Sequence, residues 1–231
     1  MWLNEQQITD AAISAYRKSL RRTSPRHIVI DQLFDVAKLD AVVRVLQQPE
    51  RWQTQKHSYS ALYVDNATWQ KTTEKQRFVQ RDLWQQDTLS TNVSSENIAQ
   101  AFLSFLRSND FLSLLSRIFQ VSLTDINVAK PDLNTNYFRL GADDFVNQHA
   151  DDSPGREVCM LLYLNKEWQR NDGGELVFMA KDDKPITIAP LYNRCVLFDP
   201  ASNGAEHWVN ALPPGNSDKY RYNVTSWYWS E

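Results

Sequence analysis

The sequence predicts a mixed α/β (α+β) fold, in which short strands form a sandwich or barrel and helices from the first half of the chain brace it. Up to about residue 120, apolar residues recur mainly at three- and four-residue spacings, the period of amphipathic helices. From Val121 onward they alternate in short runs between turn-forming residues, as in antiparallel strands. With 231 residues, 42% of them hydrophobic, the chain can bury one large core. We therefore expect a single domain over residues 1–231, with 1–120 as mainly helical support and 121–231 as the strand-rich half.

The helices expected in the first half are amphipathic and need an apolar surface to cover. One of them, over residues 95–107, places Ile98, Phe102 and Phe105 on one face. The sheet that begins after these helices is the obvious partner for such a face. The expected helices cover Asn4–Arg22, Val36–Leu46, Ser95–Arg107 and a segment beginning at Asp110, and a strand is expected to begin at His27.

The strands expected in the second half are short and regularly spaced, which favours a sandwich or barrel such as a jelly roll, with its pocket between two sheets. The polar segment Gln53–Val93 shows less order, and a run beginning at Ser60 is its one candidate strand. The expected strands of the second half are Leu123–Val128, Asn136–Leu140, Val158–Asn165, Glu175–Met179, Pro185–Ile188, Arg194–Phe198, His207–Ala211 and Tyr220–Trp229.

Composition narrows the classes of function. A net charge of -3 provides no overall positive field, so we expect no nucleic-acid partner. No apolar run is long enough to cross a bilayer or resembles a signal peptide, so we expect no membrane association and a cytoplasmic location. Cys159 and Cys195 stand in apolar runs and are predicted to be buried, reduced thiols without a catalytic role.

Two of the four histidines are arranged with an aspartate as ligands of a metal would be. His149 and Asp151 are two residues apart, so both side chains can leave a short extended segment on one side, and His207 would join them through tertiary folding. Two histidines and one carboxylate form the facial triad of non-haem iron(II) oxygenases. Asp144 and Asp152 are alternative carboxylates, and the alternative for each histidine is a purely structural role.

Five motifs follow one another in the second half of the chain. They are YFRLGADDFVNQHAD at 137–151, REVCMLLYLNKEW at 156–168, GGEL at 173–176, HWV at 207–209 and RYNVTSWY at 221–228. Together they resemble the 2-oxoglutarate- and iron(II)-dependent oxygenases, specifically the prolyl 4-hydroxylase-like family. The resemblance covers roughly residues 121–231 and implies that this catalytic half forms a double-stranded β-helix, or jelly roll. It also implies that His149, Asp151 and His207 hold the iron.

Arg221 matches the family residue that pairs with the distal carboxylate of 2-oxoglutarate. A planar guanidinium suits this task because it donates two parallel hydrogen bonds to a carboxylate. The alternative is an ordinary surface arginine of a strand. The two-residue period of a strand places Asn223, Thr225 and Trp227 on the same face, so these side chains are expected to line the same pocket.

Other cosubstrate contacts come from the resemblance. It implies that the hydroxyl of Tyr163 is a second partner of the distal carboxylate and that Leu161 packs against the carbon chain. The alternative for Tyr163 is a core tyrosine with a hydrogen-bond partner. Tyr137 or Arg139 is expected to occupy another family position that contacts the cosubstrate.

The resemblance implies a dioxygenase that uses Fe(II), 2-oxoglutarate and O2 to hydroxylate an unactivated C–H bond, with release of succinate and CO2. It suggests a prolyl residue of a protein as the substrate and ascorbate as a further cofactor. Because function does not follow from fold, a free amino acid or another small molecule stays open as the substrate. The segments Gln53–Val93 and Asp199–Glu206 are the candidates for substrate contact.

Two hypotheses from other classes compete with this one. The first is a non-catalytic jelly-roll binding module, which the complete triad and Arg221 argue against. The second is a cupin-type metalloenzyme that works without 2-oxoglutarate. Arg221 discriminates between the last hypothesis and the oxygenase, because such an enzyme has no oxo-acid carboxylate to hold.

Overall fold

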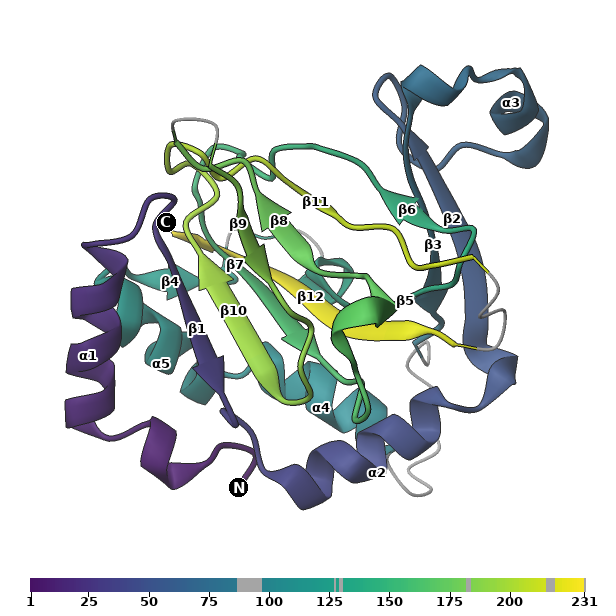
Figure 1. Ribbon diagram of the computed structural model, residues 1–231. Helices are drawn as coiled ribbons and strands as arrows, with labels where there is room; N and C mark the ends of the chain where they lie inside the picture. The colour runs from purple at the N-terminus through teal and green to yellow at the C-terminus, as the bar shows by residue number, and fades with distance from the viewer. Residues whose placement is uncertain (87–96, 127, 129–130, 182–183, 215–218, 231) are drawn as a thin grey trace.

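The computed structural model describes residues 1–86, 97–126, 128, 131–181, 184–214 and 219–230 (Figure 1). Its α-helices are α1 (Asp10–Leu20), α2 (Val36–Leu46), α3 (Asn66–Lys71), α4 (Ile98–Leu106) and α5 (Asn109–Phe119). Its strands are β1 (His27–Asp31), β2 (Trp52–Ser58), β3 (Arg77–Trp84), β4 (Leu123–Thr124), β5 (Thr135–Leu140), β6 (Phe145–Val146), β7 (Arg156–Tyr163), β8 (Leu176–Phe178), β9 (Ile186–Ile188), β10 (Arg194–Phe198), β11 (His207–Val209) and β12 (Arg221–Ser230).

The described strands form two antiparallel sheets of unequal size. The larger sheet has the order β1-β10-β7-β12-β5-β3-β2, with β4 paired to β12 and β6 paired to β3. The smaller sheet has the order β11-β8-β9. Figure 1 shows the small sheet in front of the large one, and a backbone bridge between His149 and His207 links the two. These two sheets are the jelly roll that the sequence predicted, and the helices complete the α+β fold.

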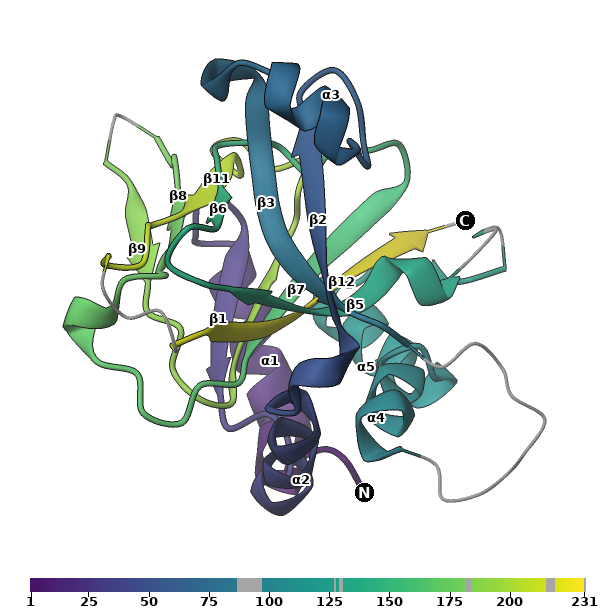
Figure 2. The same cartoon turned by 90° about the vertical axis from the view of Figure 1, so that its right-hand side faces the viewer.

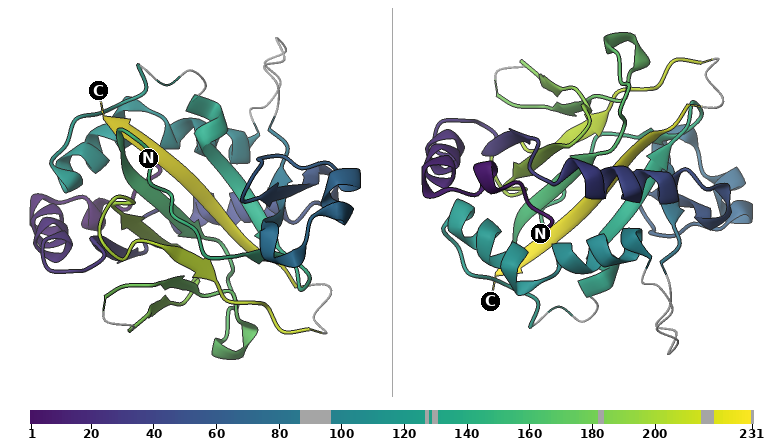
Figure 3. Two further views of the ribbon diagram at one scale, coloured as in Figure 1. Left: turned by 90° about the horizontal axis from the view of Figure 1, so that it is seen from above. Right: turned by 90° about the horizontal axis from the view of Figure 1, so that it is seen from below.

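The helices cover one face of the large sheet, as their apolar faces predicted. Val158, Met160 and Leu162 of β7 lie in one core cluster with residues of α1, α2, α4 and α5. Seen from below, these helices lie across the strands (Figure 3). The alternate residues of β7 point to the opposite face, toward the small sheet, where they form a second cluster with β8. The period of two along this strand thus separates the supporting core from the site.

Three of the helices begin directly after a residue whose side chain caps the first turn. Thr9 and Asp35 cap the first turns of α1 and α2 by accepting hydrogen bonds from backbone N–H groups, and Ser108 does the same for α5. Helices α4 and α5 were predicted correctly as a successive pair. Among the described helices, none is long and apolar enough to cross a membrane.

The segment that showed least order in the sequence forms a hairpin with a helix at its tip. Strands β2 and β3 pair along their length, and α3 lies between them in the chain; Figure 2 shows this unit rising from the edge of the sheet. The strand expected to begin at Ser60 is wrong, because residues 60–64 belong to the turn region after β2. Most side chains of β2 and β3 are polar or only partly buried, so the alternation that marks a strand is weak there. Residues 87–93 of the predicted polar segment lie outside the described residues.

Most predicted strands of the second half match observed ones within one or two residues, and the observed β10 has the predicted bounds. The first is an exception, because β4 contains only Leu123–Thr124. After it, Asp125 turns to form an ion pair with Arg107 of the helical layer, which ends the strand. The structure adds β6, a two-residue strand that the sequence did not reveal.

Candidate functional site

Three side chains converge between the two sheets in an arrangement that could hold a metal ion. His149 and Asp151 follow β6, and His207 begins β11. One ligand atom from each lies within 4.8 Å of the other two. The Nε2 atoms of both histidines are 3.7 Å from the carboxylate oxygens of Asp151. Two imidazoles and one carboxylate on one side of a common point match the donor set of a facial triad.

Both histidine rings are oriented by the backbone. Nδ1 of His149 is 2.8 Å from the carbonyl oxygen of Asn147, and Nδ1 of His207 is 2.9 Å from that of Ala205. A ring nitrogen must donate to a carbonyl, so Nδ1 carries the proton and the lone pair of Nε2 faces the aspartate. Burial also lowers the pKa of His207 to about 4, which keeps the ring neutral at pH 7 and able to bind a metal.

Asp151 is fixed by neighbours on β7 and β12. The indole Nε1 of Trp227 donates to its Oδ2 at 3.0 Å, and Arg156 donates to its backbone carbonyl. Burial raises the pKa of this carboxyl, but His207, His149, the hydrogen bond from Trp227 and the charge of Arg156 together leave the pKa below its ordinary value. The ionised form, which a metal requires, is therefore favoured. The alternative carboxylates are not in this group: Asp144, for example, accepts from the backbone N–H of Gly141.

A small cavity extends from these three residues to Arg221, whose side chain is almost fully buried. Its Nε donates to the carbonyl of Gly174 at 2.6 Å, and its Nη1 donates to Oδ1 of Asn223 at 2.8 Å. Its Nη2 has no partner among the described residues. Asn223 in turn donates to the hydroxyl of Thr225 at 2.9 Å. The guanidinium is thus held on two sides, and its third nitrogen is left to meet a ligand.

Tyr163 and Leu161 of β7 lie on the same face as Arg221. The Tyr163 ring centroid is 5.0 Å from the Arg221 guanidinium carbon. Burial raises the pKa of Tyr163 to about 12, although the nearby cation opposes the rise. The two groups are close enough to influence each other, yet no donor and acceptor between them have hydrogen-bond geometry, and the tyrosine hydroxyl has no partner in the described structure. Leu161 lines the cavity, as do Thr225 and Trp227.

The prediction that Tyr137 contacts the cosubstrate is wrong. Its side chain lies on the face of the large sheet that packs against the helices, not on the face that lines the cavity. It pairs with Val224, an even-numbered residue of β12 that faces the helices. Its hydroxyl donates to the carbonyl of Ala99 in α4 at 2.8 Å. Arg139 has the same parity and forms an ion pair with Asp82 at 2.9 Å. Both residues therefore support the fold rather than the cavity.

A larger cleft of about 790 Å³ lies beside His149 and Asp151. Its walls come from the β2–β3 hairpin, from residues 133–138, and from the loop that carries His149 and Asp151. Four residues line both this outer cleft and the inner cavity: Arg81, His149, Asp151 and Trp227. Part of the segment Gln53–Val93, one of the two candidates for substrate contact, thus lines this cleft. The other candidate, Asp199–Glu206, lines neither cavity, and Glu206 instead accepts a hydrogen bond from Gln148.

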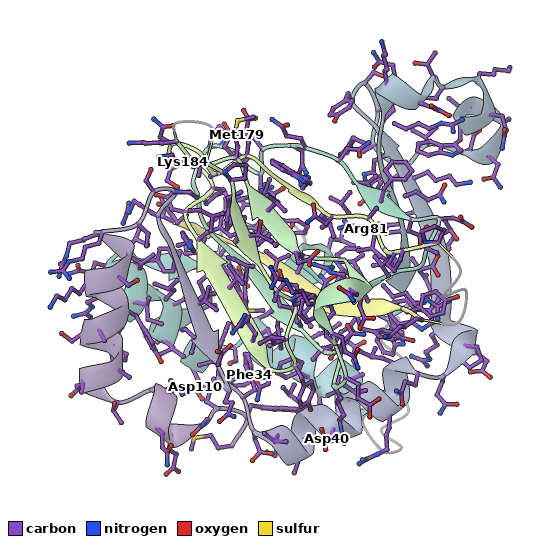
Figure 4. All side chains as sticks on the ribbon, in the orientation of Figure 1. Phe34, Asp40, Arg81, Asp110, Met179 and Lys184 are labelled. Atoms are coloured by element: carbon purple, nitrogen blue, oxygen red, sulfur yellow. The ribbon has the colours of Figure 1, made fainter. Side chains whose placement is uncertain are left out.

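Arg81 is the cavity residue that sequence reasoning missed. Figure 4 labels it on β3, in the part of the molecule where the hairpin joins the central sheet. The sequence shows only that Arg81 stands two residues from Val79 and two from Leu83, so that all three side chains share one face if the segment is a strand. Without the pairing of β3 with β5, nothing assigned that face to the site.

The two histidines and the aspartate along this cavity match the donor set of non-haem iron(II) oxygenases. Residues 135–229 match the model of the 2OG-Fe(II) oxygenase superfamily. The matched region contains His149, Asp151, His207 and Arg221.

Curated relatives agree with this family. Over 128 residues, the chain is 30% identical to prolyl 3-hydroxylase OGFOD1 of Xenopus laevis, which covers 52% of this chain and 23% of the relative. Over 143 residues it is 24% identical to the Mus musculus protein of the same name, covering 58% of this chain and 25% of the relative. The chain thus spans about a quarter of the length of these relatives.

Solved structures show the same fold. A Pseudomonas putida prolyl-4-hydroxylase is similar with a TM-score of 0.61 at 16% identity, covering 95% of this chain and 99% of that one. A Trichoplax adhaerens prolyl hydroxylase, in complex with a hypoxia inducible factor peptide fragment, is similar with a TM-score of 0.62 at 18% identity, covering 98% and 96%. These similarities confirm the jelly-roll fold.

Proposed function

We propose that this protein is a 2-oxoglutarate- and Fe(II)-dependent dioxygenase that hydroxylates a prolyl residue of a protein, with release of succinate and CO2. One observation carries the proposal: a single cavity joins a set of metal donors to a buried arginine with one unpartnered nitrogen. A metal site alone would fit many reactions. A second anchor for an anion at the far end of the same cavity fits a dicarboxylate cosubstrate.

His149, Asp151 and His207 would hold the iron. The residues fit the metal because both Nε2 atoms carry free lone pairs and the carboxyl is ionised. Trp227 keeps one oxygen of the aspartate in place, so the carboxylate is oriented before the metal binds. When bound, the iron supplies the activation of O2, which is coupled to decarboxylation of the 2-oxo acid.

Arg221 would hold the distal carboxylate of 2-oxoglutarate through Nη2. The side chain does not need to reorganise, because Gly174 and Asn223 already fix its other nitrogens. The hydroxyl of Tyr163 is a second donor, and its proton has no acceptor among the described residues. Its raised pKa keeps it protonated at neutral pH, which is the form that donates to a carboxylate.

The walls of the inner cavity would exclude water from the cosubstrate. Leu161, Leu176 and Val209 supply apolar surface around the polar groups. No side chain of this chain needs to act as a nucleophile or general base. The protein's contribution is to bind, to orient and to keep the reacting groups dry.

The outer cleft would receive the substrate. It reaches the metal ligands and is large enough for several residues of an extended peptide. Curated relatives are named prolyl 3-hydroxylases, and a neighbour in fold is named a prolyl-4-hydroxylase, so a prolyl side chain is the best-supported target and either ring carbon fits these names. A free amino acid is the second candidate, because the cleft is open enough to admit one. Ascorbate dependence and a cytoplasmic location also stay predictions.

The test combines binding with turnover. Iron(II)-loaded protein is titrated anaerobically with 2-oxoglutarate, and the visible charge-transfer band of the complex is followed. Oxygen is then admitted with a mixture of proline-containing peptides, and mass spectrometry follows the gain of one oxygen atom and the formation of succinate. Asp151→Ala should abolish both signals, whereas Asp152→Ala, the matched control outside the donor group, should keep them. Full turnover by Asp151→Ala would disprove the assignment.

A further inference from the structure

Arg81 occupies the boundary between the inner cavity and the outer cleft, and it lines both. It stands on β3 opposite Gln55 of β2, which also lines the cleft. Its guanidinium carbon lies 3.4 Å from the ring centroid of Phe138, on the neighbouring strand β5. The stacked ring fixes the plane of the guanidinium and leaves its edge directed to other groups.

Among the described residues, no carboxylate or hydrogen-bond acceptor is paired with the Arg81 cation. Its Nε is buried and unpartnered, and among the described residues Arg81 forms neither a hydrogen bond nor an ion pair. Arg77 on the same strand also has a buried Nε without a partner, but its Nη2 donates to the carbonyl of Trp69 at 2.8 Å. Burial lowers the pKa of Arg81 to about 10, which still leaves the group charged at neutral pH. A buried charge without a counterion is costly, so it calls for an anion from elsewhere.

The nearby charged groups do not provide that anion. Asp151 acts on Arg81 at longer range but does not form an ion pair with it, and the charge of Asp151 would be engaged by a bound metal. Arg221 also lines the inner cavity, and its positive charge contributes to lowering the pKa of Arg81. Arg156 also lines the outer cleft, but it lies 4.0 Å from a carboxylate oxygen of Asp151 and donates to the backbone carbonyl of that residue. Once a dicarboxylate neutralises Arg221, Arg81 therefore keeps an unpaired charge.

We propose that Arg81 binds a carboxylate of the substrate and so selects targets with an acidic group near the hydroxylated carbon. The inference rests on the proposed function, because it assumes that 2-oxoglutarate occupies the inner cavity. Arg221 and the metal would account for both carboxylates of that cosubstrate. Arg81 also lines the outer cleft, which Arg221 does not, and this favours the substrate as the source of its anion. A planar guanidinium stacked on a ring suits a carboxylate better than a neutral amide.

The experiment measures binding without turnover. Protein loaded with Zn(II), which does not support the oxidation, is saturated with 2-oxoglutarate and titrated by ligand-observed NMR. The probes are N-acetyl-L-proline and its uncharged amide, followed by short proline peptides with aspartate or asparagine at each position near the proline. The variants are Arg81→Gln and Arg81→Lys, with Arg77→Gln as the matched loss of charge on the same strand outside both cavities. The affinity for 2-oxoglutarate is measured for each protein.

The expected result is that at least one acidic probe binds wild type about tenfold or more tightly than its amide counterpart. The preference should disappear in Arg81→Gln, persist in part in Arg81→Lys and be unchanged in Arg77→Gln, with 2-oxoglutarate affinity unaltered throughout. No preference for any acidic probe in wild type would overturn the inference. A large loss of 2-oxoglutarate affinity in Arg81→Gln would also overturn it, because the carboxylate bound by Arg81 would then belong to the cosubstrate. Absence of 2-oxoglutarate binding to wild type would instead remove the proposed function itself.

Discussion

Replacing Arg221 by Met is the sharpest perturbation of the cosubstrate pocket. Methionine keeps much of the length of the side chain but removes the cation and its donors. The hydrogen bonds from Nε to Gly174 and from Nη1 to Asn223 disappear, and so does the free Nη2. Because burial already lowers the pKa of Arg221, losing the charge removes an unfavourable desolvation as well as two hydrogen bonds. We therefore expect the fold to survive.

The effect on cosubstrate binding should be large. Truncating one partner of a buried, hydrogen-bonded charge pair costs about 3–5 kcal/mol, because the other charge is left unpaired. Each 1.4 kcal/mol corresponds to a factor of about ten in Kd. The hydroxyl of Tyr163 would still donate to the carboxylate, so we expect the lower part of this range, a Kd about a hundredfold higher. Arg221→Lys keeps the charge without the planar donors and should lose about tenfold.

The assay is anaerobic titration of the iron(II)-loaded protein with 2-oxoglutarate, read at the visible band of the complex. Arg139→Met is the matched control, since Arg139 pairs with the neighbour of Arg221 but belongs to the helix-facing side, where it holds Asp82. The control should bind 2-oxoglutarate within about threefold of wild type, as expected for a site on the other side of the sheet. If Arg221→Met also bound within threefold while remaining folded, the assignment of Nη2 to the distal carboxylate would be wrong.

Three further predictions test the surroundings of the site. In Gly174→Ala, the new Cβ would lie 2.7 Å from Cδ of Arg221 at a φ of +75°, so we expect about tenfold weaker 2-oxoglutarate binding by titration and a lower unfolding midpoint. Tyr137→Phe should lower the free energy of unfolding by about 1–2 kcal/mol in urea, because a buried carbonyl loses its donor, and should leave 2-oxoglutarate affinity unchanged; a selective loss of affinity would restore this residue to the site. Burial lowers the pKa of His57 to about 4, so the unfolded chain binds its proton more readily and stability from this group falls as pH drops from 6.5 to 4. Between pH 7 and pH 4.5, the free energy of unfolding in urea should therefore fall by about 1 kcal/mol less for His57→Phe than for wild type, a figure reduced for partial solvent screening. An equal fall in both proteins would contradict the reasoning.

The sequence predicted those parts of the site that follow from local period. On β12, the odd-numbered residues Arg221, Asn223 and Thr225 face the cavity, and a period of two was enough to group them. The i, i+2 pair His149 and Asp151 was equally local. His207 was placed by chemistry rather than geometry, because no local rule brings it to the pair.

The parts that failed depend on how strands pair. Tyr137 lies within the family motif, but its face is set by the register of β5 against β12, where it meets Val224. A shift of one residue would have turned it into the cavity, and a single sequence does not specify such a shift. Arg81 was missed for a related reason. Its strand has partly buried residues on both faces, so only its pairing with β5 shows which face meets the site.

Several buried polar groups in and near the two cavities lack a hydrogen-bond partner among the described residues. Within the described structure, the buried side-chain atoms without a hydrogen-bond partner include Nη2 of Arg221, the hydroxyl of Tyr163 and Nε of Arg81. Such groups destabilise a folded chain unless something pairs with them, and they are tolerated where a ligand does so. Ligand binding should therefore stabilise the folded protein, because the ligand supplies the missing partners.

That expectation can be measured on the folded protein with Zn(II) in place of iron. At a concentration one hundred times its Kd, a ligand that binds only the folded state adds about 2.7 kcal/mol to the free energy of unfolding. For a chain of this length the midpoint of thermal unfolding should rise by several degrees with 2-oxoglutarate, about 2–4 °C for each kcal/mol. Arg221→Met should start from an equal or higher midpoint without ligand, because it lacks the unpaired cation, and should gain little at the same concentration. A variant with a much lower starting midpoint would show that Arg221 serves mainly to hold Gly174 and Asn223 in place, and the argument that its third nitrogen is kept for a ligand would fail.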